Sequence, residues 1–235
     1  MLCALKTGCA MIKKAFSYGM LLVLIPLVIL LGAVLFQDRQ YAWISLCITV
    51  IACVPFFLSF EKGKSGTKQM IIIAVMVAIA AAGRILFAPI PGFKPVTAVI
   101  IITAMYFGGQ SGFMTGALAA VVSNFYFGQG PWTPFQMFVW GLIGLFAGLI
   151  SEPLKRHKII LILYGVFSGV IFSIIMDIWT VLWWDGSFNW ARYWAAVISA
   201  SGLIAVYAVS NVVFLLALGK PIGKKLERIK SKYGL

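Results

Sequence analysis

Long uninterrupted apolar runs are the feature that most restricts how this chain can fold. Eight of them, separated by polar turns, occupy residues 17–36, 41–60, 68–88, 95–108, 110–127, 133–151, 158–182 and 191–218. Because hydrocarbon cannot hydrogen-bond to free backbone groups, a chain crosses a bilayer only as helices or as a closed β-barrel. The runs are continuous rather than alternating, which excludes the barrel. The sequence therefore predicts an all-α, polytopic membrane helical bundle.

The formal net charge of +13 is distributed in a way that sets the orientation of these spans. If both termini are cytoplasmic, the basic residues gather in the inner segments, and the exceptions at outer ends are Arg39, Arg84, Lys94 and Arg192. This distribution follows the positive-inside rule of membrane proteins. The basic charge thus indicates topology and contact with anionic membrane lipid, and it argues against nucleic-acid binding.

A shift in composition divides the chain into four parts. Residues 1–60 are predicted to form an N-terminal transmembrane helix pair, 61–67 a basic linker, 68–218 a six-helix membrane core, and 219–235 a basic cytoplasmic tail. The linker contains a Gly-Lys-Ser triplet, but Leu58 stands where a phosphate-binding loop requires its upstream glycine. The sequence also lacks catalytic motifs and Cys/His clusters. We therefore expect no enzyme activity, no ATP hydrolysis by this chain, no metal site and no bound cofactor.

Four polar residues are predicted to lie at the same depth, near the outer ends of four different spans. They are Arg84, Asn124, Gln136 and Asp177. Polar groups inside a membrane are costly and often mark functional positions. This layer is therefore a candidate binding site. Arg84 and Asp177 have a second interpretation, a mutual ion pair that holds two helices together.

Helical spacing places further residues beside this layer. Thr133, Gln136 and Trp140 share one helix face, and Asp177 and Trp184 share a face of the seventh span. The outer ends are also rich in tryptophan and tyrosine, which is typical of an interfacial belt. Aromatic faces combined with a few amides also suit a large, partly apolar solute.

A stripe of small residues follows one face of the third span at Ala74, Ala78 and Ala82. Small side chains let another helix approach closely, which promotes helix association in lipid. Similar stripes occur at Gly112, Gly116 and Ala120, and at Gly144 and Gly148. The spacing alone therefore favours internal packing as the explanation of the alanine stripe.

Taken together, the chain resembles the substrate-binding S-components of energy-coupling factor (ECF) vitamin transporters. The resemblance covers about 68–218 and rests on the alanine stripe, on Phe93-Lys-Pro-Val96, and on the stretch from Ser123-Asn124 to Gly130-Pro-Trp-Thr-Pro-Phe-Gln136. It implies a multi-pass protein of the bacterial cell membrane that captures a vitamin at its outer face. It also implies three partners, a membrane coupling protein and two cytoplasmic ATPase subunits.

The resemblance also implies roles for particular residues. The stripe Ala74, Ala78 and Ala82 becomes the surface that meets the coupling protein. The outer cluster becomes the substrate-binding site, for which we expect Arg84, Phe93, Lys94, Asn124, Gln129, Trp132, Thr133, Gln136, Trp140, Asp177 and Trp184.

Two outer motifs are most similar to the cobalamin-type branch of that family. They are Pro131-Trp-Thr-Pro134 and Met176-Asp-Ile-Trp-Thr180. Cobalamin would then be the transported substrate rather than a cofactor. Riboflavin, pantothenate or a pyrimidine would also suit aromatic and amide groups.

The main alternative is a self-sufficient, proton-coupled secondary transporter of a small organic solute, with Asp177 as the proton relay. An intramembrane enzyme acting on lipid would need a base or a metal cluster on the membrane face, which the sequence does not supply. A pure scaffold would leave the polar outer layer without a role.

Overall fold

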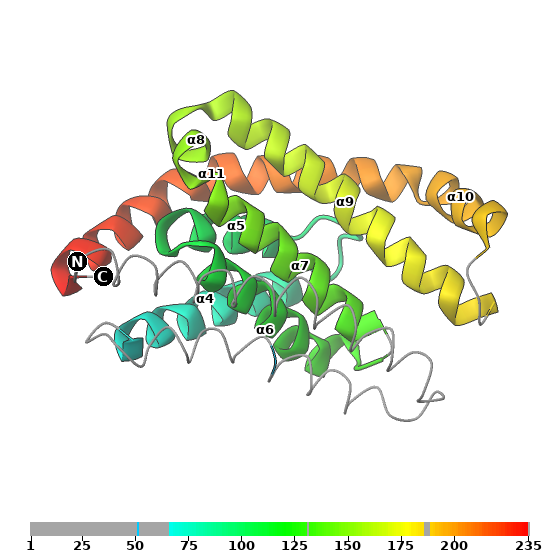
Figure 1. Ribbon diagram of the computed structural model, residues 1–235, viewed down its shortest axis with the longest axis horizontal. Coiled ribbons are helices and arrows are strands. Elements are labelled where there is room, and N and C mark those ends of the chain that lie inside the picture. The colour runs from blue at the N-terminus through cyan, green and yellow to red at the C-terminus, as the bar shows by residue number, and fades with distance from the viewer. Residues whose placement is uncertain (1–50, 52–65, 131, 186–188, 235) are drawn as a thin grey trace, which may run out of the picture.

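The computed structural model describes residue 51 and residues 66–130, 132–185 and 189–234. These residues form the helices α4 (Gly66–Leu86), α5 (Val96–Phe107), α6 (Gly109–Phe127), α7 (Trp132–Leu149), α8 (Ser151–Arg156), α9 (Lys158–Asp185), α10 (Trp190–Ser199) and α11 (Ser201–Tyr233). The described part of the chain is an all-α bundle, which confirms the predicted fold class (Figure 1). Apart from residue 51, the predicted N-terminal helix pair lies outside the described residues, as do residues 61–65 of the predicted linker; its last two residues begin α4.

Four of these helices, α4, α7, α9 and α11, are long and apolar enough to cross a membrane. At about 1.5 Å of rise per residue, a helix of α4's length spans roughly 30 Å, the thickness of the hydrocarbon core. The C-terminal end of α9 and α10 lie at one end of the bundle, and α8 and the end of α11 lie at the other (Figure 1). The predicted topology makes the α10 end the outer one.

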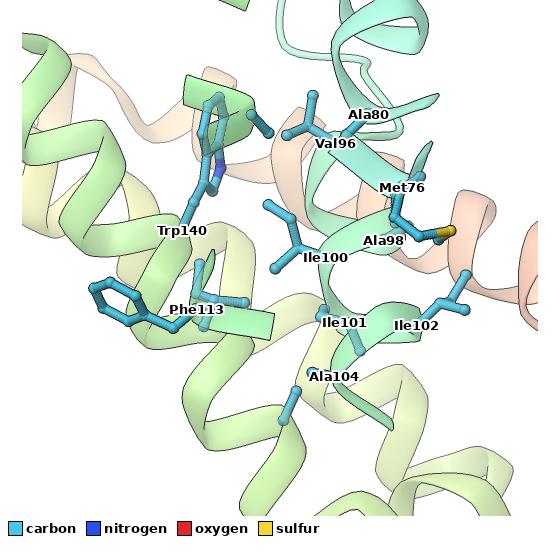
Figure 2. Close-up of a cluster of buried hydrophobic side chains, with 14 of the residues drawn as sticks. Met76, Ala80, Val96, Ala98, Ile100, Ile101, Ile102, Ala104, Phe113 and Trp140 are labelled. Atoms are coloured by element: carbon cyan, nitrogen blue, oxygen red, sulfur yellow. The ribbon is translucent and has the colours of Figure 1, made fainter. Parts of the chain in front are cut away.

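The short helix α5 lies at the centre of the bundle. Every residue from Val96 to Met105 is buried. Figure 2 shows Ile100, Ile101 and Ile102 together with buried side chains of neighbouring helices, among them Met76, Phe113 and Trp140. A helix that is apolar on all sides must be covered by protein or by lipid, and here protein covers it. The shortness of this span therefore reflects burial in protein rather than contact with lipid.

Glycines bring α6 and α7 into backbone contact. A Cβ atom added to Gly112 would lie 2.6 Å from the carbonyl oxygen of Gly144, and one added to Gly116 would meet the carbonyl oxygen of Trp140. Only residues without a side chain permit this approach. The stripes at Gly112/Gly116 and Gly144/Gly148 are therefore internal packing surfaces. They fix Trp140 and the rest of the α7 face against α6.

The last apolar run differs from its prediction at both ends. The run 191–218 is divided at Ala200 between α10 and α11, and α11 continues to Tyr233 through the residues expected to form a tail. Ala200 is a good helix former, so hydropathy gives no sign of the break. Beyond residue 218, Ile222, Leu226 and Ile229 contact the core, which gives this segment a reason to stay helical.

Candidate functional site

Arg84, near the C-terminal end of α4, is a buried charge held by α6. Its side chain is 8% exposed. Nη1 donates hydrogen bonds to Oγ of Ser123 at 2.5 Å and to Oδ1 of Asn124 at 2.6 Å. The guanidinium carbon also lies 4.4 Å from the ring centre of Phe127 and 5.2 Å from that of Trp140. Two neutral side chains and two aromatic rings therefore position this cation.

Asn124 connects Arg84 to α7. The residue is 0% exposed. While Oδ1 accepts from Arg84, Nδ2 donates to Oγ1 of Thr133 at 2.8 Å and to Oε1 of Gln136 at 2.9 Å. A buried amide with its hydrogen bonds made is rigid, because losing any partner would leave a polar group unsatisfied. Asn124 thus fixes Arg84 and Gln136 relative to each other.

The turn before α7 completes this network. Oγ1 of Thr133 donates to Oε1 of Gln129 at 3.0 Å, and Nε2 of Gln129 donates to the carbonyl oxygen of Val121 at 3.0 Å. The backbone N–H of Gly130 points at Oγ1 of Thr133 at 3.3 Å. Gln129 is exposed, so it ties the turn to α6 from the outer side.

A cavity of about 180 Å³ opens beside this network. Its walls come from α4, α5, α7, α9 and α11 and from the segment before α5. The lining residues are Arg84, Gly92, Lys94, Val96, Thr97, Gln136, Trp140, Gly169, Phe172, Met176, Tyr207 and Asn211. Four predicted site residues, Arg84, Lys94, Gln136 and Trp140, are thus brought together around one space.

One wall of the cavity is aromatic. Trp140 stacks on Phe172, with ring centres 5.3 Å apart and an angle of 17° between the planes. Phe172 in turn meets Tyr207 edge to face at 5.4 Å. Such rings offer flat apolar surface together with polar edges. This wall suits a planar ring system.

Lys94 enters the cavity from the segment between α4 and α5. Its backbone N–H donates to Oγ of Ser210 at 2.8 Å, and its carbonyl accepts from the same hydroxyl at 3.1 Å, which anchors the segment to α11. Nζ lies 4.7 Å from the ring centre of Phe127. Burial, and secondarily the charge of Arg84, lower the pKa of the Lys94 ammonium from its ordinary value.

Other predicted site residues lie outside the cavity lining. Phe93 packs with Phe87 and Phe214, its ring centre 5.0 Å from that of Phe214. Trp132 meets Trp179 edge to face at 5.9 Å. Trp184 is 72% exposed, as expected of a residue in an interfacial belt. Any contact of these side chains with a ligand stays a prediction.

Asp177 on α9 also stands apart from the network. The described residues contain no ion pair between Arg84 and Asp177, because Arg84 bonds to Ser123 and Asn124 instead. Oδ2 of Asp177 is buried and has no hydrogen-bond partner. The interpretation of these two residues as a helix-linking ion pair is therefore not realised.

Comparison with protein-family models identifies the family of this chain. Residues 64–228 match the family described as the S component of ECF-type riboflavin transporters. The chain belongs to this family. Neither the curated proteins nor the solved structures gave a significant match. The match confirms the predicted S component, and with it a multi-pass membrane protein that serves as a transporter's substrate-binding subunit rather than as an enzyme. It does not single out the cobalamin-type branch.

The alanine stripe of this S component lies on the surface. Ala74, Ala78 and Ala82 are all exposed on α4, while the intervening Met76, Val77, Ala80 and Ala81 are buried. The stripe therefore does not serve packing within the described bundle, in contrast with the glycine stripes of α6 and α7. Binding of the coupling protein by this surface stays a prediction.

Several cavity residues of the S component were not predicted from the sequence. They are Gly92, Val96, Thr97, Gly169, Phe172, Met176, Tyr207 and Asn211. Among them, Asn211 also links two helices, because its Nδ2 donates to the carbonyl oxygen of Gly165 on α9 at 3.1 Å. Tyr207 is one turn before Asn211, so a search for polar groups at helical spacing would have found it.

Proposed function

We propose that this S component captures a vitamin in the cavity beside Arg84 and presents it to partner subunits for uptake. The observation that carries the proposal is the buried network from Arg84 through Asn124 to Gln136, which opens into a concave space with an aromatic wall. Ligand sites combine a mostly apolar lining with a few fixed polar groups. Family membership supports a membrane coupling protein and two ATPase subunits as the source of energy.

A flavin is the vitamin that the cavity favours. The family description names riboflavin. The rings of Trp140, Phe172 and Tyr207 offer stacking surface for a planar ring, while Gln136 offers an amide to its polar edge. The volume, about 180 Å³, lies below the roughly 300–1,000 Å³ of typical ligand pockets, which disfavours cobalamin far more strongly than riboflavin.

Cobalamin is the competing ligand. It has the support of the resemblance carried by 131–134 and by Met176–Thr180, and of the position of Met176 in the cavity wall. A corrinoid is much larger than a flavin, so its capture would require the cavity to widen.

Calorimetric titration of the purified chain in detergent tests the proposal. Riboflavin, cyanocobalamin, pantothenate and thiamine are titrated separately into a sample shown to be folded. We expect tight binding of a flavin that Trp140→Ala weakens at least tenfold. Trp194→Ala is the matched control, since Trp194 is 56% exposed and does not line the cavity. Equal losses in both variants would place the site elsewhere.

The proton-coupled transporter has one supporting observation, the buried and unpartnered Oδ2 of Asp177. A carboxyl group without partners inside a bundle is a candidate proton carrier. This function requires uptake into liposomes that contain only this chain, driven by an imposed pH gradient. The main proposal instead requires that uptake occur only when coupling protein and ATPases are present.

A further inference from the structure

The cavity carries two positive charges and no carboxylate. Arg84 and Lys94 both line it, and the other lining residues carry no charge. Both cations lie against the same aromatic ring, that of Phe127, at 4.4 Å for the guanidinium carbon and 4.7 Å for Nζ of Lys94. One side of the cavity is therefore electropositive.

Neither cation has an acidic partner in the part of the chain that the structure describes. The ion pairs there are centred on Glu152 and on Asp185. Asp177 follows the lining residue Met176 on α9, but it does not itself line the cavity and forms no ion pair with Arg84. The whole chain has only six acidic residues against nineteen Lys and Arg. The counter-charge for this pair of cations is thus not evident within the bundle.

An unbalanced cation at this position is costly. Arginine keeps its charge in proteins, and a charge within a membrane bundle is unfavourable unless a partner or water compensates it. Both hydrogen bonds of Arg84 to described residues use Nη1, so Nη2 and Nε remain available to a ligand in the cavity that Arg84 lines. A guanidinium fork binds carboxylate and phosphate oxygens with two parallel hydrogen bonds.

We propose that the ligand carries an anionic group, a carboxylate or a phosphate monoester, that binds between Arg84 and Lys94 while the rest of the ligand lies on the wall formed by Trp140 and Phe172. This inference rests on the proposed function, because it concerns the same cavity. The lowered pKa of Lys94, caused in part by Arg84, agrees with two cations held close together. An incoming anion would relieve their mutual repulsion.

Ligand pairs that differ only in the anion test this inference. Riboflavin is compared with riboflavin 5′-phosphate for the phosphate case, and panthenol with pantothenate for the carboxylate case. We expect at least one anionic member to bind ten or more times more tightly than its neutral counterpart. Arg84→Gln and Lys94→Gln should each reduce that ratio at least threefold. Lys220 is exposed and does not line the cavity, so Lys220→Gln should leave the ratio unchanged.

The outcomes separate this inference from the proposed function. Tight binding of a neutral vitamin, with no gain from the anion, overturns the inference and keeps the vitamin-capture function. A preference for the anion that survives both substitutions also overturns the inference, because residues other than Arg84 and Lys94 would then bind the anion. A phosphate preference identifies a phosphorylated ligand, and a carboxylate preference an acid; both support the inference.

A second measurement covers the case in which no vitamin binds or Arg84→Gln fails to fold. Thermal unfolding of the unmodified chain and of Lys94→Gln is followed in inorganic phosphate and in acetate, against chloride at equal ionic strength. Anions that bind the native state raise its unfolding temperature. A rise that Lys94→Gln removes supports the anion site even if vitamin capture is wrong. The absence of any such rise, together with the absence of vitamin binding, overturns both proposals.

Discussion

Replacing Asn124 with alanine tests whether the site depends on a residue that is not part of the cavity wall. Asn124 is 0% exposed and does not line the cavity, yet it hydrogen-bonds to two residues that do, Arg84 and Gln136. Without it, neither group is held where the ligand needs it. If Arg84 and Gln136 each lost one hydrogen bond to the ligand, at about 0.5–1.5 kcal/mol per bond, the binding free energy would weaken by about 1–3 kcal/mol.

That loss corresponds to roughly a 5- to 150-fold rise in Kd. Titration calorimetry of Asn124→Ala with the best-binding vitamin measures it, alongside a thermal unfolding curve that shows the variant is folded. A double-mutant cycle then separates positioning from direct contact. Because Asn124 acts partly through Gln136, the double variant Asn124→Ala/Gln136→Ala should lose less affinity than the sum of the two single losses. Additive losses, or an unchanged Kd for Asn124→Ala, would refute the reasoning.

Three further predictions concern the surface, the packing and the pH dependence. Ala78→Leu should leave vitamin binding intact but abolish uptake in cells that express the coupling subunits. Ala217, on α11, is also exposed, and Ala217→Leu should transport normally. Normal uptake by both variants would show that the alanine stripe does not bind the coupling protein. Gly144→Ala should lower the unfolding temperature, because the added Cβ would collide with the backbone of Gly112. Gly202 has open space around it, so Gly202→Ala should be neutral or stabilising by about 0.5–1 kcal/mol. Equal effects of the two substitutions would contradict the close approach of α6 and α7. The lowered pKa of Lys94 predicts that affinity for an anionic ligand falls as pH rises through that pKa, at a lower pH than for an ordinary lysine, because the ammonium loses its charge. The fall should be absent in Lys94→Gln, and an identical pH profile in both proteins would assign it to another group.

Much of this fold follows from the sequence because the bilayer leaves few alternatives. The runs that became α4, α5, α6, α7 and α9 were predicted to within three residues at each end. The break at Ala200 and the helical continuation to Tyr233 were missed. A change in helix direction inside an apolar run, and the burial of Leu226 against other helices, depend on contacts that hydropathy does not record.

Polar residues in apolar spans predicted part of the candidate site, again because the bilayer restricts where such residues can lie. Arg84, Asn124 and Gln136 are expensive to bury separately, so their presence at one depth predicted that they meet. Their order in the network was not predictable. Spacing could not show that Asn124 bonds to both of the others, or that Asp177 lies apart from all three.

The small-residue stripes show most clearly what sequence and tertiary structure each decided. By itself the sequence determined that this is a helical membrane protein, which helices can approach others closely, and at what depth the polar groups lie, because these follow from hydropathy and from the helical period. It could not distinguish the stripe at Ala78 from the stripe at Gly112, since both have the same spacing. Only the tertiary structure turned Gly112 toward Gly144 and left Ala78 on the surface. The physical reason is that the direction of a helix face is set by all of its neighbours at once, and no local pattern contains that information.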